Sequence, residues 1–122
     1  MKKVILLACF VLASALALSQ EKGLLNLAQD AMNEKNYNSA IEFYTKAIEK
    51  QKDFAPAYYG RAVAKSFNGM FAESIEDFNA ATRLDPKYAA AFYGRGVAES
   101  RLKEHARSEE RRVGKECRSR WS

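Results

Sequence analysis

A 34-residue period organises the middle of this chain and limits what it can fold into. Shifted forward by 34, residues 55–66 align with residues 89–100, and eight of the twelve aligned positions are identical. Shifted backward, residues 75–81 align with residues 41–47, where Ile, Glu, an aromatic residue and Ala recur. A fixed period of this length indicates a repeat array, in which each unit buries its apolar face against its neighbours.

Within each unit the apolar residues recur at helical spacing, interrupted by residues that end helices. In the first unit, residues 33–36 (Asn-Glu-Lys-Asn) are turn formers between two such stretches. In the second unit, Gly69 is predicted to end the first helix because glycine adopts the left-handed conformation without steric cost. Pro86 is predicted to end the second helix because it lacks an N–H group and disfavours helical geometry at Asp85. Each unit is therefore predicted to form a pair of helices.

The residues also resemble the tetratricopeptide repeat family over residues 21 to 106. The central unit supplies Tyr58, Ala62, Phe78 and Pro86 on the family's spacing. The sequence departs from the family pattern at Arg61, Lys65 and Ser74 in the central unit and at Lys52 in the first. The resemblance implies an all-α, antiparallel helix-turn-helix solenoid. Its repeats would be residues 21–54, 55–88 and 89–106, the last truncated to its first helix.

The first nineteen residues resemble a secretory signal peptide that precedes the fold. Lys2 and Lys3 are followed by an uncharged apolar run over residues 4–18 and by small residues at Ala17 and Ser19. A run of fifteen residues is short for a membrane span, which needs about 20. We therefore expect cleavage after Ser19 or Ala17, export from a bacterial cell to the periplasm or envelope, and no stable membrane span afterwards. Lipidation of Cys9, in a lipoprotein-like Leu-Leu-Ala-Cys box, and an uncleaved anchor are the alternatives.

Residues 107–122 show neither the apolar period nor kinship with the repeats. They resemble the conceptual translation of a common sequencing-library adapter, in which AGATCGGAAGAGC reads Arg-Ser-Glu-Glu and begins Arg. We expect this segment to be foreign to the fold; the alternative is a genuine basic tail, solvated and disordered. We accordingly expect the chain to be the N-terminal fragment of a longer protein, with a third repeat that lacks its second helix.

The net charge of +5 says little about partners. Residues 20–106 carry twelve basic and twelve acidic side chains, so the excess lies in the predicted signal peptide and tail. Nucleic-acid binding rests on a long-range positive field, which this segment lacks, so we expect no nucleic-acid partner. Cys9 and Cys117 both fall outside the segment, which therefore has no disulfide framework.

No set of residues indicates catalysis, a cofactor or a metal. The one histidine, His105, stands beside the tail. Neighbours on a helix point apart, so Glu76 and Asp77 are interpreted as a solvated helix face rather than an acid pair.

The Gly-Arg pairs at residues 60–61 and 94–95 lack the spacing and the preceding strand of a phosphate loop. We expect Arg61 and Arg95 to pair with acidic residues of a neighbouring helix; ligand binding is the alternative. The family resemblance implies that Ala62 and Gly96, at the eighth position of their repeats, pack at helix crossings.

The resemblance implies that the first helix of each repeat lines a concave groove. The candidate groove residues are Leu25, Gln29, Met32, Tyr59, Val63, Ser66, Tyr93 and Val97, with Phe67, Ser100 and Arg101 beside them. Tyr59 and Tyr93 are expected to stack one above the other and to suit peptide recognition, because tyrosine combines a large apolar area with a polar tip. The alternative is that these residues merely pack neighbouring helices. Family members that grip acidic C-terminal tails have Lys and Asn where this chain has Leu25 and Gln29, so that specificity is not expected.

These observations predict a non-catalytic scaffold that binds a protein or peptide in the groove. The first alternative is a repeat module at the front of a longer enzyme or signalling receptor whose catalytic domain is missing. A third interpretation is an assembly or outer-membrane scaffold subunit. Fold does not by itself determine function, so the prediction depends on the family resemblance and on the absence of a catalytic set.

Overall fold

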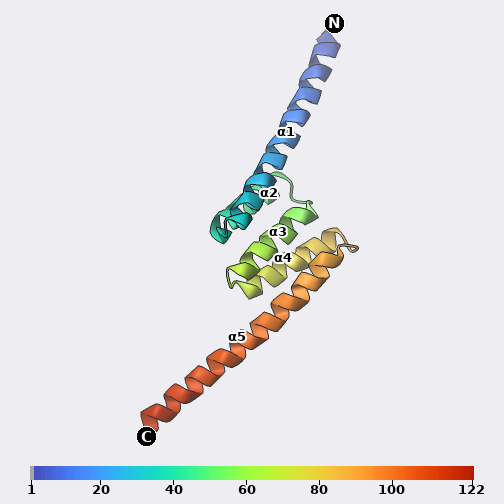
Figure 1. Cartoon of the computed structure of the whole chain (residues 1–122). Coiled ribbons are helices and arrows are strands. Elements are labelled where there is room, and N and C mark those ends of the chain that lie inside the picture. The colour runs from blue at the N-terminus through green and yellow to red at the C-terminus, as the bar shows by residue number, and fades with distance from the viewer. Residues whose placement is uncertain (1) are drawn as a thin grey trace.

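The chain folds as a row of antiparallel helices. The computed structural model describes residues 2–122, except for the side chains of Lys2, Leu6, Leu7 and residues 15–22, so the predicted cleavage positions lie outside the described side chains. The helices are α1 (Lys2–Asn33), α2 (Tyr37–Lys50), α3 (Ala55–Phe67), α4 (Phe71–Leu84) and α5 (Ala89–Trp121). Each helix packs against the next in sequence, and α3 also contacts α5. The predicted all-α solenoid of helix pairs is confirmed (Figure 1).

The turns within the helix pairs repeat the same hydrogen bonds 34 residues apart. After α3, the Met70 amide donates to the Lys65 carbonyl (2.9 Å), and Gly69 has a φ of +80°. After α1, the Asn36 amide donates to the Ala31 carbonyl (2.8 Å), and Lys35 has a φ of +60°. This left-handed ending satisfies carbonyls that the helix leaves free. Gly69 therefore ends α3 as predicted, and Lys35 adopts the same conformation despite its side chain.

The connection between the second and third repeats ends α4 where predicted. The last helical residue is Leu84, and Asp85 is extended, as the residue before a proline prefers. The Asp85 carboxylate then accepts a hydrogen bond from the Lys87 amide at 3.0 Å.

Close approach of helices in the core depends on two glycines that are 34 residues apart. A Cβ added at Gly60 would overlap the ring of Tyr44, and one added at Gly94 would overlap the ring of Phe78. An aromatic residue on the second helix of one repeat therefore lies directly on the backbone of the next repeat. Gly96 was predicted to pack at a crossing, but nothing lies within 4 Å of a Cβ built there. Ala62 is fully buried, as predicted.

Both terminal helices extend beyond the paired region. Figure 1 shows the first half of α1 and the second half of α5 running away from the repeats at opposite ends. Helix α5 continues through residues 107–121, which were predicted to be foreign or disordered, and every residue after Ala98 is exposed. These residues are helical in the structure but bury no side chain. No helix in the described part of the chain is long and apolar enough to cross a membrane.

Candidate functional site

Two adjoining hollows run along the face formed by the first helices of the repeats. The first, of about 420 Å³, lies between α1 and α3, and the second, of about 490 Å³, lies between α3 and α5. Tyr59 and Val63 line both hollows. The two hollows therefore adjoin at Tyr59 and Val63, and together we call them the groove.

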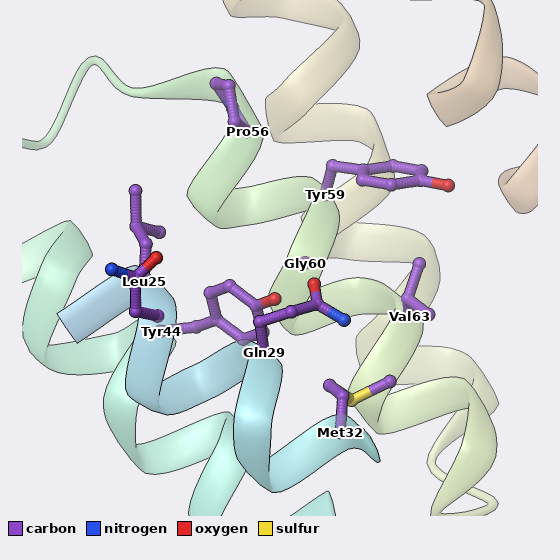
Figure 2. A pocket seen from close by; sticks show the side chains of 9 residues that line it. Leu25, Gln29, Met32, Tyr44, Pro56, Tyr59, Gly60 and Val63 are labelled. Carbon is purple, nitrogen blue, oxygen red and sulfur yellow. The ribbon is translucent and has the colours of Figure 1, made fainter. Parts of the chain in front are cut away.

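All eight candidate groove residues line this groove. The first hollow takes Leu25, Gln29 and Met32 from α1, and the second takes Ser66 from α3 and Tyr93 and Val97 from α5. Figure 2 shows the α1 residues facing Tyr59 and Val63, with the Tyr44 ring between the two helices. Phe67 and Arg101 also line the second hollow. The geometry brings the predicted residues together, while their binding role stays a prediction.

The groove also contains residues that the sequence analysis missed. These are Asn26, Tyr44, Pro56 and Gly60 in the first hollow and Phe71, Phe78, Ala90 and Gly94 in the second. The ring of Tyr44 belongs to a second helix and reaches the groove because Gly60 presents bare backbone in front of it. The repeated pairing of a glycine with an aromatic residue sixteen positions earlier was the available signal.

The two predicted anchor tyrosines have different environments. The Tyr59 ring packs edge-on against Tyr88, with centroids 5.1 Å apart, and also lies 5.9 Å from the Phe78 ring. The Tyr93 side chain is 76% exposed. Among the described residues, no ring contact joins Tyr59 to Tyr93. The expected stack is therefore wrong: Tyr59 belongs partly to the core, and Tyr93 projects freely at the groove.

The groove is largely apolar and nearly uncharged. Its polar members among the described residues are Asn26, Gln29, Tyr44 and Tyr59 in the first hollow, and Tyr59, Ser66, Tyr93 and Arg101 in the second. The Ser66 hydroxyl is buried and has no hydrogen-bond partner in the described part of the chain. Burial raises the pKa of the Tyr44 hydroxyl above 10.0, and the nearby Tyr88 and Tyr59 add to the shift. Such a surface can hold apolar side chains and offer a few hydrogen bonds.

A buried ion cluster fixes α3 to α4 behind the groove. Arg61 donates to both carboxylate oxygens of Asp77, and the Lys65 ammonium lies 2.8 Å from Asp77 Oδ2. Arg61 also donates to the Thr45 hydroxyl of α2 at 3.3 Å. The predicted structural ion pair of Arg61 is confirmed. Asp77 is buried, so its assignment to a solvated face is wrong; its neighbour Glu76 is exposed.

Arg95, the counterpart of Arg61, has different partners from those expected. It donates to the Asn79 side chain of α4 at 2.9 Å and lies 3.7 Å from Glu99 of its own helix. Asn79 and Thr45 are themselves 34 residues apart, so this half of the network repeats. The predicted acidic partner on a neighbouring helix is not found for Arg95 among the described residues.

The fold and groove together define a helix-pair repeat protein with a concave, apolar face. No group of three or more His, Cys, Asp or Glu that could hold a metal occurs among the described residues. A family model described as a tetratricopeptide repeat matches residues 21–53 and 55–88, which is more than half of the chain. The chain belongs to the tetratricopeptide repeat family.

Individual relatives agree with this assignment. The Sgt2 TPR domain from Aspergillus fumigatus is 30% identical, with a TM-score of 0.67 over 71% of this chain and 58% of that one. The second TPR domain of human RPAP3, solved in complex with the HSP70 peptide SGPTIEEVD, is 26% identical, with a TM-score of 0.68 over 77% of this chain and 78% of that one.

A curated relative matches a shorter stretch. The NADPH oxidase activator of Dictyostelium discoideum is 36% identical over 44 residues, which are 36% of this chain and 7% of that protein. The chain thus spans a small part of this curated relative and a little over half of the Aspergillus domain.

Proposed function

We propose that this chain is a non-catalytic scaffold that binds a segment of another protein in the groove between α1 and α5. The observation that carries the proposal is that two apolar hollows, lined by the first helices of all three repeats, adjoin at Tyr59 and Val63. Two adjoining hollows along one face suit an extended peptide better than a compact small molecule. The human RPAP3 domain, which shares this fold, was solved with a bound peptide.

The ligand class follows from the lining of the groove. Its apolar walls favour a peptide with aliphatic or aromatic side chains on both sides of Tyr59, since burial of apolar area drives such binding. Among the described residues, the one charged member of the lining is Arg101, at the α5 end, where it favours an acidic residue of the ligand. Leu25 and Gln29 line the first hollow. We therefore expect the peptide SGPTIEEVD to bind weakly compared with peptides rich in apolar residues.

Tyr93→Ala tests the proposal. Peptides selected from a displayed random library would be titrated against the wild-type chain and the variant by fluorescence anisotropy. Loss of this exposed ring should weaken binding about tenfold or more, because truncated anchors commonly cost 2 kcal/mol or more. Val113→Ala removes an exposed apolar side chain far from the groove and is the matched control. Equal affinity of Tyr93→Ala and wild type for every selected peptide would contradict the proposal.

We further propose that the chain is exported from a bacterial cell to the periplasm or envelope. Lys2, Lys3 and the apolar run that follows them support this proposal. Val4, Ile5, Phe10 and Leu12 are exposed in α1, so these side chains contribute nothing to the repeat core. Mass spectrometry of the envelope fraction would give the mature start. A start at Gln20 agrees with the proposal, an acylated Cys9 would indicate a lipoprotein, and a cytoplasmic chain that keeps Met1 would contradict export.

We also propose that these repeats serve as a module of a longer protein. The Dictyostelium relative supports this, since the match covers a small share of its length. Under this proposal the groove recruits a partner to a neighbouring domain, which would be an enzyme, a receptor or an envelope scaffold. The reading frame downstream of Ala106, determined from independent genomic sequence, tests both this proposal and the foreign origin of residues 107–122.

A further inference from the structure

One face of α5 has residues equivalent to those that α3 packs against α4, but no later helix packs against it among the described residues. Helix α3 presents Tyr58, Arg61, Ala62 and Lys65 to α4, through the core around Phe78 and through the ion pairs to Asp77. Shifting these positions by 34 residues gives Phe92, Arg95, Gly96 and Glu99 on α5. We call these four residues, together with Leu102 one turn further on, the open face of α5.

The open face is exposed in the chain. Phe92 is 43% exposed and Leu102 is 39% exposed, and the Glu99 side chain is 50% exposed. Gly96 corresponds to Ala62 on α3 and to Ala28 on α1. Both alanines are fully buried, Ala28 against α2 and Ala62 against α4. With 3.6 residues per turn, the open face points away from Tyr93 and Val97, which line the groove. It is therefore a second surface, separate from the proposed peptide site.

The chemistry of this face fits a second copy of itself. Arg95 and Glu99 are one turn apart with opposite charges, and Phe92 and Leu102 flank them. In an antiparallel pair of α5 helices, a two-fold axis level with Val97 would place Arg95 of each copy beside Glu99 of the other. The same axis would place Phe92 beside Leu102. Isologous interfaces have this property, since residue i meets residue j and residue j meets residue i.

Gly96 permits the helices to approach. Nothing lies within 4 Å of a Cβ built at this position, and at 100° per residue the bare backbone lies at the edge of the open face next to Phe92. Glycine allows another backbone or side chain to come close. Glu99 stands where the covered helix α3 has Lys65, so the face carries one charge of each sign, as a self-complementary surface requires.

We propose that the chain dimerises through the open face of α5, with Arg95 of each copy paired with Glu99 of the other. Arg95 donates through Nη1 to the Asn79 side chain of α4 at 2.9 Å and lies over the Phe92 ring, and its Nε lies 3.7 Å from Glu99 of its own helix. This long contact leaves the half-exposed Glu99 carboxylate able to take a closer partner. The dimer buries apolar side chains that a monomer leaves in water. It also leaves both peptide grooves open on the far sides of the two α5 helices.

Charge reversal on the full chain tests the proposal. Sedimentation velocity should show a reversible dimer for wild type. In the dimer, Arg95→Glu would place an acidic side chain beside Glu99 of the other copy at both contacts. Glu99→Arg would likewise place a basic side chain beside Arg95 of the other copy. Each variant should therefore raise the dimer dissociation constant by at least about tenfold. Arg83→Glu makes the same change in net charge on an exposed α4 position outside the open face and should leave the dimer unchanged.

Mixing the two variants separates a specific interface from general destabilisation. A chain with Arg95→Glu offers two acidic residues, and a chain with Glu99→Arg offers two basic ones, so the mixture should form a heterodimer visible by native mass spectrometry. Circular dichroism would verify that each variant keeps its helix content. A monomeric wild type would overturn the proposal, as would failure of the mixture to associate. Association that survives both reversals, for instance through the apolar start of α1, would overturn it as well.

Discussion

Arg61 holds Asp77 with two hydrogen bonds across the α3–α4 crossing, from Nε to Oδ2 at 2.8 Å and from Nη2 to Oδ1 at 2.7 Å. The Asp77 side chain is 7% exposed and also carries the Lys65 contact. A carboxylate that holds two cations in a partly dry site is structural. It has no free face for a ligand or for acid–base chemistry.

Removing this carboxylate should destabilise the fold. Asp77→Ala leaves Arg61 and Lys65 in a largely buried site without a counter-ion, which should lower the free energy of unfolding by about 3 kcal/mol. Urea denaturation followed by circular dichroism measures the loss. Glu76→Ala changes the adjacent, exposed carboxylate and should stay within about 0.5 kcal/mol of wild type. Equal stability of the two variants would contradict the role given to Asp77.

Replacing Lys35 with glycine should stabilise the chain. Lys35 has a φ of +60° at the turn where the second repeat has Gly69 at +80°. A residue with a Cβ is destabilised by about 1 kcal/mol in this left-handed conformation, because the Cβ comes too close to the following carbonyl oxygen. Lys35→Gly should therefore raise the free energy of unfolding by about that amount. Thermal unfolding would show a higher midpoint. Gly69→Ala is the reciprocal variant and should lower the midpoint; a lower midpoint for Lys35→Gly would contradict backbone strain at Lys35.

The glycine that faces Tyr44 should not tolerate a methyl group. Gly60→Ala puts a Cβ into the Tyr44 ring, and such overpacking costs about 1–3 kcal/mol. Gly23→Ala is the control, since a Cβ there meets nothing within 4 Å and alanine favours the helix by about 1 kcal/mol. Denaturant unfolding should thus shift the two variants in opposite directions. A stabilised Gly60→Ala would show that Tyr44 moves freely.

Stability should fall at alkaline pH through Tyr44. Burial raises the pKa of this hydroxyl in the folded state above the unfolded value of about 10. The folded state therefore retains the proton longer, and this contribution is complete below pH 10 and declines as pH rises through the folded pKa. Tyr44→Phe should flatten the decline in unfolding free energy above pH 10. Tyr93→Phe changes an exposed ring as a control, and an unchanged slope in Tyr44→Phe would contradict the assignment.

Much of the fold could be predicted from the local pattern of the chain. The 34-residue period, the glycine at 69 and the proline at 86 predict paired helices and their ends, because helix periodicity and backbone stereochemistry act over a few residues. The resemblance to the tetratricopeptide repeat family predicted all eight groove positions. Residues that repeat on the first helices of stacked units necessarily line one face, whichever side chains surround them.

Contacts between helices decided the rest. Asp77 and Glu76 are neighbours with the same chemistry, yet only Asp77 meets Arg61, because adjacent residues point about 100° apart and one of them faces the crossing. Gly60 and Gly94 are packing positions and Gly96 is not, because this depends on where the Tyr44 and Phe78 rings lie. Tyr59 and Tyr93 occupy equivalent places, but only Tyr59 has Tyr88 of the following connection against its ring. Periodicity specifies which residues share a face of one helix, whereas burial and pairing depend on a second helix whose position is determined by packing.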